Sequence, residues 1–173
     1  MDNFITVSPI AKFSVLSFNI QKAIDFLKVG IMIEKININR MMLGGIVAGL
    51  CMLVFGMIVH GVLLEDHYSV LRNAGFIRSS PNWPGMIVHH LSVIFAGIPL
   101  AVIYVLIRKT VGPGPGSAFR LGIMIGLICL PAAASMYAFY DFGRMIPLAN
   151  ALTMMTQCVI GTLVAGSLYK DNR

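Results

Sequence analysis

The side chains in this sequence best suited to chemistry are its four histidines, His60, His67, His89 and His90. Neutral imidazole is a good ligand for zinc, copper or iron, an axial ligand for haem, and a proton partner for a quinol headgroup. His60 stands near the end of one long apolar stretch, and His89 and His90 stand near the beginning of the next. His67 lies just beyond the first of these stretches, so we expect all four imidazoles to lie toward the same end of the protein.

Further polar side chains are expected at the same end. They flank the apolar stretches and comprise Glu65, Asp66, Tyr137, Tyr140, Asp141 and Asn150. The simplest interpretation is a solvated rim where helices leave the hydrocarbon. His60 fits this interpretation less well, because it lies inside the apolar boundary, where a polar group needs a partner. We expect His60 to be buried and hydrogen-bonded to Tyr140, Asn150 or His90.

Cofactor binding is an alternative role for His60, His89 and His90. The sequence contains no HExxH or CxxC motif and no recognisable nucleophile paired with a base. Haem or a divalent metal is therefore an alternative that the sequence does not favour, and no catalytic residue is predicted. The chain has three cysteines, Cys51, Cys129 and Cys158. They fall within apolar stretches and are interpreted as packing residues.

Four apolar stretches must position these side chains. They cover residues 41–64, 86–107, 118–140 and 146–169, and each is long enough for a helix to cross a bilayer. Hydrophobic residues make up 57% of the chain and charged residues only 12%, which is far from the composition of a soluble domain. We predict an all-α fold in which residues 41–173 form one domain, a four-transmembrane-helix bundle.

Residues 1–40 are predicted to be a cytoplasmic extension of this bundle. Between residues 10 and 33, apolar side chains recur at intervals of three and four, with most polar side chains on the other face. This pattern predicts an amphipathic helix lying in the membrane interface. Docking on a partner subunit is one alternative. Translation starting at Met41 or Met42 is another, and it would leave the preceding residues without a role.

Small and amide residues predict how the spans pack. These residues are Gly45, Gly49 and Gly56 in the first span, Gly122 and Gly126 in the third, and Asn150, Gln157 and Gly161 in the fourth. Each set shares one arc of its helix. Glycines allow close approach of helices, and amides facing lipid would be left unpaired, so these arcs are expected to face other helices. Pro99 and Pro131 predict bends in the second and third spans.

Basic residues predict the orientation. Ten Lys and Arg residues lie in the extension, the second connection with its flank and the tail, whereas three lie in the first and third connections. This asymmetry places both termini in the cytoplasm and indicates a multi-pass protein of the cell inner membrane. The net charge of +6 is explained by the same asymmetry and by attraction to anionic lipid headgroups, and nucleic-acid binding is not predicted.

The run from Leu43 to Phe76 reads LGGIVAGLCMLVFGMIVHGVLLEDHYSVLRNAGF. It is similar to the opening of small bacterial four-span integral membrane proteins of unknown function. The turn GPGPGSAFRLG and the closing span up to Lys170 continue the resemblance. The resemblance implies the four-span layout and carries no activity or residue role. Residues before Met41 depart from it.

Three functions are compatible with these features. The favoured one is a noncatalytic accessory or assembly subunit, packed through its glycine faces in a larger membrane complex or a homo-oligomer. The first alternative is a haem-, metal- or quinone-binding redox protein that uses His60, His89 and His90. The second alternative is a small transporter whose pore uses Asn150, Thr153 and Gln157, although it lacks a mid-membrane acidic residue for proton coupling.

Overall fold

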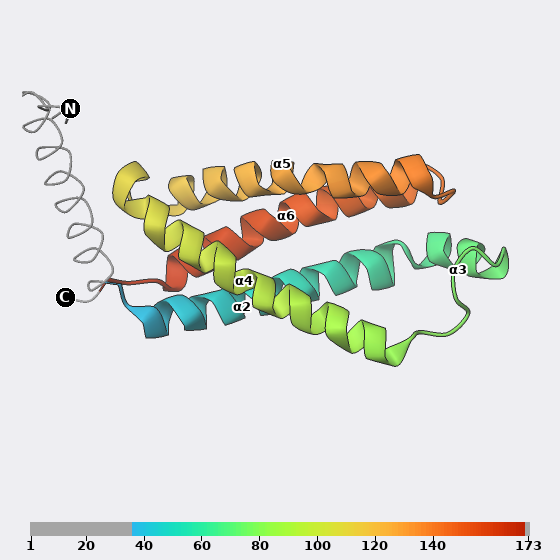
Figure 1. Cartoon of the computed structure of the whole chain (residues 1–173), viewed down its shortest axis with the longest axis horizontal. Helices are drawn as coiled ribbons and strands as arrows, with labels where there is room; N and C mark the ends of the chain where they lie inside the picture. Colours follow the sequence, from blue (N-terminus) through green and yellow to red (C-terminus); the bar gives the residue numbers. More distant parts are fainter. Residues whose placement is uncertain (1–35, 172–173) are drawn as a thin grey trace, which may run out of the picture. The chain divides into compact units, whose positions relative to one another are not determined.

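The computed structural model describes residues 36–171, and within them Asn37–Lys170 form one compact unit. The fold of this unit is all-α, as predicted. Its helices are α2 (Ile38–Ile58), the π-helical turn η1 (Val59–Leu63), α3 (Glu65–Asn73), α4 (Trp83–Val111), α5 (Pro115–Phe139) and α6 (Met145–Leu168) (Figure 1). The amphipathic helix predicted between residues 10 and 33 lies outside the described residues.

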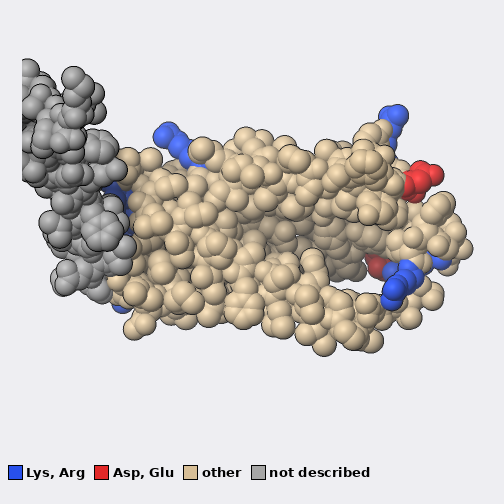
Figure 2. All heavy atoms as spheres, viewed as in Figure 1, with Lys and Arg blue, Asp and Glu red and all other residues tan. Residues whose placement is uncertain are grey.

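Four of the described segments are long and apolar enough to cross a membrane: Ile38–Leu63, Trp83–Val111, Pro115–Phe139 and Met145–Leu168. The shortest has 24 residues, which at the helical rise spans about 36 Å. Large apolar side chains such as Leu43, Ile128 and Phe139 are exposed, as expected for surfaces that face lipid. On the face drawn in Figure 2, the charged side chains of the described residues gather near the ends and leave the middle without charge. The chain is a multi-pass membrane protein, as predicted.

The helix ends follow local capping and turn chemistry. Asn37 caps α2, because its Oδ1 accepts a hydrogen bond from the Arg40 N–H at 3.1 Å. Between α4 and α5, Gly112 and Gly114 have φ angles of 87° and 137°, which other residues rarely adopt. The predicted second span, residues 86–107, is shorter than the observed helix, because α4 continues through Arg108 and Lys109 to Val111. Long basic side chains at a helix end reach the headgroups while their stems stay in apolar surroundings.

Helices α2 and α4 cross with their backbones in contact. A Cβ atom added to Gly49 would lie 1.9 Å from the carbonyl oxygen of Ile94, and one added to Gly97 would lie 2.1 Å from the carbonyl oxygen of Gly45. Small residues also meet where α6 joins this pair, in a core of Ala48, Ala101 and Ala165. The three helices are therefore held together at the crossing by residues with almost no side chain.

Helix α5 packs mainly along α6 (Figure 1). A Cβ atom added to Gly122 would lie 2.5 Å from Cα of Val159, and one added to Gly126 would lie 2.7 Å from Cγ of Met155. Helix α5 therefore stands beside the group formed by α2, α4 and α6. Pro131 lies inside α5 and Pro99 inside α4, and both helices continue through these residues.

Candidate ligand cavity at the histidine end

We call the end of the bundle where α2 passes into η1 and α4 begins the histidine end. His60 reaches its position there through η1, in which the last turns of the first span widen from an α-helix to a π-helix. Such π-helical turns are rare and occur frequently at functional sites. The wide turn ends at Leu64, whose buried side chain anchors the point where the chain enters α3.

The partner of His60 is Tyr68 of α3. The Nδ1 atom of His60 lies 2.9 Å from the Tyr68 hydroxyl, and both side chains are partly buried. The prediction that His60 bonds to Tyr140, Asn150 or His90 is therefore wrong. Burial raises the pKa of Tyr68 above its usual range, so the phenol stays protonated at neutral pH. This contact fixes the imidazole ring and leaves its Nε2 atom for other partners.

A cavity of about 620 Å³ opens at the histidine end, between the first span, α4 and α6. Its lining is Leu53, Gly56, Met57, His60, Gly61, Met86, His89, His90, Val93, Asn150, Met154 and Gln157. The three histidines predicted as a cofactor site thus border one cavity, together with two carboxamides from the predicted polar arc of α6. We call it the histidine cavity, and the view in Figure 2 shows the surface hollowed at this end.

Gln157 ties α6 to α2 at the deep side of the histidine cavity. Its Nε2 atom donates a hydrogen bond of 2.8 Å to the carbonyl oxygen of Met52. A Cβ atom on Gly56 would lie 2.6 Å from this same Nε2, so the glycine makes room for the amide. The carbonyl of Met52 lies in a membrane-spanning helix, where such a bond links two helices directly.

Asn150 is bonded less completely. Its Nδ2 atom lies 3.2 Å from Sδ of Met136 and 3.7 Å from Sδ of Met154. Thioether sulfur is a weak acceptor, so these contacts satisfy an amide poorly. Asn150 therefore brings to the histidine cavity both donor and acceptor capacity that a bound molecule could use.

His89 and His90 complete the polar part of the lining. Their rings have centroids 5.7 Å apart, and His90 is half-buried whereas His89 is exposed. Within residues 36–171, no group of three or more His, Cys, Asp or Glu side chains is placed to hold a metal ion. The imidazoles and carboxamides of the lining can hydrogen-bond to a molecule in the histidine cavity.

Two tyrosines expected at the histidine end, Tyr137 and Tyr140, do not border the histidine cavity. Tyr137 and Tyr140 are exposed, and Tyr140 stacks on Phe142 with ring centroids 5.2 Å apart. Tyr140 does not reach His60, because α5 packs mainly along α6. Nothing in a helical periodicity says which neighbour a polar face meets.

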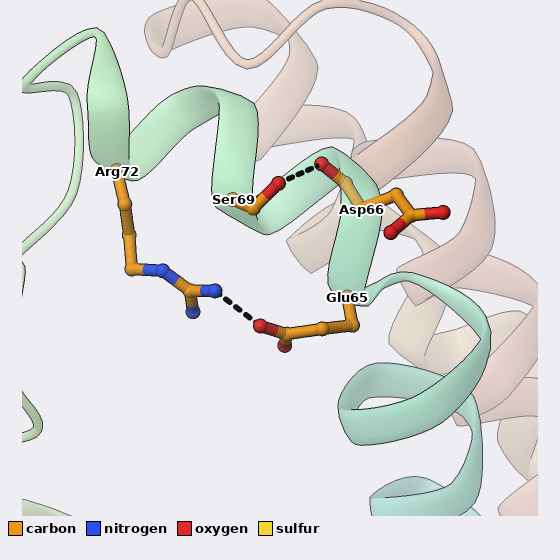
Figure 3. A network of polar contacts seen from close by, with 4 residues as sticks. All are labelled: Glu65, Asp66, Ser69 and Arg72. Atoms are coloured by element: carbon orange, nitrogen blue, oxygen red, sulfur yellow. Dashed lines mark hydrogen bonds and ion pairs between the residues drawn. The ribbon is translucent and has the colours of Figure 1, made fainter.

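The acidic residues after the first span serve α3 itself. Glu65 forms an ion pair with Arg72, and the backbone carbonyl of Asp66 accepts a hydrogen bond of 2.7 Å from the Ser69 hydroxyl (Figure 3). His67 is exposed. These contacts stabilise a short amphipathic helix next to the histidine cavity and leave the lining without a charged side chain of the Asp, Glu, Lys or Arg type.

Sequence reasoning missed Tyr68 and the methionines of the lining. Met86, His90 and Val93 recur at intervals of three and four, so they share one face of α4, and this face was detectable from the sequence. Tyr68 had no such signal, because its approach to His60 depends on the π-helical turn and the turn at Leu64.

The opposite end of the bundle is closed by direct contacts, and we call it the basic end. The backbone N–H of Asn37 donates to the Tyr169 hydroxyl at 3.2 Å, which joins the beginning of α2 to the end of α6. The Arg108 guanidinium lies 4.9 Å from the centre of the Tyr169 ring. The N–H of Gly114 donates to the Tyr104 hydroxyl at 3.2 Å.

Comparison with protein-family models, with curated proteins and with solved structures finds no match for this chain. The function is therefore argued from the histidine cavity.

Proposed function

We propose that this protein is a noncatalytic membrane protein that binds a small amphiphilic molecule in the histidine cavity. The observation that carries the proposal is the composition of the lining, in which three imidazoles and two carboxamides stand among methionine, leucine, valine and glycine. Ligand sites combine apolar walls with a few convergent polar groups, and a volume of about 620 Å³ lies within their usual range. A molecule with an apolar body and a polar head matches both parts of this lining.

A cavity-filling substitution tests the proposal. Val93 lines the histidine cavity, whereas Val88 on the same helix is exposed on the outside. We expect Val93→Phe to remove a co-purifying small molecule that the wild type and the matched control Val88→Phe retain. The measurement is solvent extraction of each protein, purified in mild detergent, followed by mass spectrometry of the extract. Equal amounts of every extracted molecule in all three preparations contradict the proposal. Met86→Trp, at a second lining position, repeats the test if Val93→Phe does not fold.

An accessory or assembly subunit is a second candidate, favoured by one feature of α5. Ala134, Ser135 and Ala138 are exposed on α5, and such small residues permit another helix to approach closely. Recovery of a monodisperse monomer with no partner, after solubilisation in mild detergent, counts against this role.

The transporter alternative has less support, because the backbones of α2 and α4 are in contact directly beyond the histidine cavity.

We also propose that the basic end faces the cytoplasm and that the protein resides in the cell inner membrane. Among the described residues, the basic ones at that end are Arg40, Arg108, Lys109, Arg120 and Lys170, and one acidic residue, Asp171, accompanies them. At the histidine end Arg72, Arg78 and Arg144 are balanced by Glu65, Asp66 and Asp141. Excess Lys and Arg in short loops favours the cytoplasmic side. A cysteine placed in the Gly112–Gly116 turn should then resist impermeant thiol reagents in intact cells, and labelling from outside contradicts the orientation.

A further inference from the structure

We infer that the molecule bound in the histidine cavity is neutral and carries an oxygen-bearing ring as its headgroup, of the quinone or quinol class. The inference rests on the proposed function and names the ligand class of the same cavity. It depends on three properties of the lining: its charge, its hydrogen-bonding groups and the sulfur atoms in its walls.

The lining offers no permanently charged side chain to an ionic headgroup. Lys, Arg, Asp and Glu are absent from the twelve residues that border the cavity. The nearby guanidinium of Arg72 is already paired with Glu65. A phosphate or ammonium group that entered the cavity would lose its water without gaining a fixed charge of opposite sign, which is strongly unfavourable. A neutral headgroup avoids this cost.

The hydrogen-bonding groups of the lining include both donors and acceptors. His60 contacts Tyr68 through its Nδ1 atom, so its Nε2 atom can bond to a ligand. A neutral imidazole nitrogen donates or accepts according to its tautomer. The carboxamide of Asn150 both donates and accepts, and its present sulfur partners are weak. A ring with carbonyl oxygens needs donors, and the same ring with hydroxyl groups also needs acceptors. Asn150, His60 and His90 offer both, so the cavity suits a quinone and its reduced form alike.

The walls of the histidine cavity suit a ring. Met57 comes from α2, Met86 from α4 and Met154 from α6, so a thioether is supplied by each of the three helices. Thioether sulfur makes favourable contacts with planar unsaturated rings, and flexible methionine side chains adapt to their shape. An isoprenoid or alkyl tail would continue along the apolar lining toward lipid.

The single tryptophan of the chain provides the test. Trp83 precedes Met86 by three residues and His90 by seven, so it shares their face of α4 at the end where the histidine cavity lies. Quinones quench indole fluorescence at short range. The full chain in lipid nanodiscs is titrated with 2,3-dimethoxy-5-methyl-6-decyl-1,4-benzoquinone, and the emission of Trp83 is recorded. We expect saturable quenching, which decyl phosphate and decyltrimethylammonium do not reverse.

Matched histidine variants locate the binding. His90→Phe should weaken quinone binding about fivefold, as for the loss of one neutral hydrogen bond, whereas His67→Phe on exposed α3 should leave it unchanged. Quenching that rises linearly without saturation in every variant reports mere partition into lipid and overturns the inference, as does displacement of the quinone by decyl phosphate. If the quinone fails to bind while Val93→Phe still loses a co-purifying molecule, the ligand class is wrong and the proposed function stands. If Val93→Phe loses nothing, the proposed function itself has failed.

Discussion

The same two helices, α2 and α4, behave differently along their length. Where Gly45 and Gly49 meet Gly97, no side chain separates the backbones. Toward the histidine end the facing positions hold Met57 and His60 on one side and Met86 and His90 on the other, and there the helices enclose a cavity. The glycine crossing therefore sets the angle between α2 and α4. Beyond the crossing, larger side chains keep the two helices apart and leave room for the histidine cavity.

The two regions also differ in how their polar groups are satisfied. At the basic end Asn37 bonds to Tyr169 and Gly114 bonds to Tyr104, so aromatic hydroxyls close the structure. At the histidine end Gln157 bonds to the carbonyl of Met52 and His60 bonds to Tyr68, whereas Asn150 has weak sulfur partners. The polar groups of the basic end therefore stabilise the fold, whereas those of the histidine end keep hydrogen-bonding capacity for a bound molecule.

The largest expected effect breaks the crossing. Gly49→Ala places a methyl group 1.9 Å from the backbone oxygen of Ile94, which a rotamer change cannot relieve. We expect a loss of about 3 kcal/mol or more in the free energy of unfolding, at the upper end for overpacked sites. Thermal unfolding in detergent, followed by size-exclusion chromatography, measures it.

Gly116→Ala is the control for that substitution. Gly116 lies in the first turn of α5, and an added Cβ atom there meets nothing within 4 Å. Its Tm should be unchanged or slightly raised, since alanine is the better helix former. Equal Tm values for Gly49→Ala and the wild type would mean that α2 and α4 do not touch at this point.

A smaller effect is expected at the tie between α6 and α2. Gln157→Leu removes the bond to the carbonyl oxygen of Met52 and should cost about 1 kcal/mol, the size typical of hydrogen bonds between transmembrane helices. Ser167→Ala on the same helix is the control, because Ser167 bonds only to the carbonyl of Val164 in its own helix. Chemical denaturation in micelles gives both values, and a Gln157→Leu protein no weaker than the control would contradict the assigned bond.

The smallest effect concerns Tyr68 at high pH. Burial raises its folded-state pKa above the ordinary value of 10.0, so its contribution to stability is complete below pH 10.0 and is lost as pH rises through the folded pKa. Wild-type Tm should therefore fall more between about pH 8 and about pH 11 than that of Tyr68→Phe. Tyr140→Phe, at an exposed tyrosine, should keep the wild-type slope. Identical slopes for Tyr68→Phe and wild type would place Tyr68 in water.

The fold was predictable because its cause is simple. Stretches of about twenty apolar residues leave a helix as the main way to satisfy the backbone in lipid, so four spans follow from length and composition. The ends of α4 were harder to predict, because Trp83 and Lys109 belong to interfacial turns where hydropathy declines while helix formation continues.

The histidine end was predictable only in part. The positions of His60, His89 and His90 near the ends of apolar stretches predicted that they lie at one end of the bundle. In the structure all three border one cavity. The partner of His60 was missed because it depends on the three-dimensional path through η1. The role expected for Tyr140 failed because a helical wheel identifies a polar face without identifying the neighbouring helix.

The most direct test of the central claim is an experimental structure of the full chain in lipid nanodiscs with the decyl benzoquinone present. The expected result is density between α2, α4 and α6 beside His90 and Asn150, with α2 and α4 in contact only at the glycine crossing. The claim is contradicted if Met57 and Val93 touch across a closed interface with no density between them.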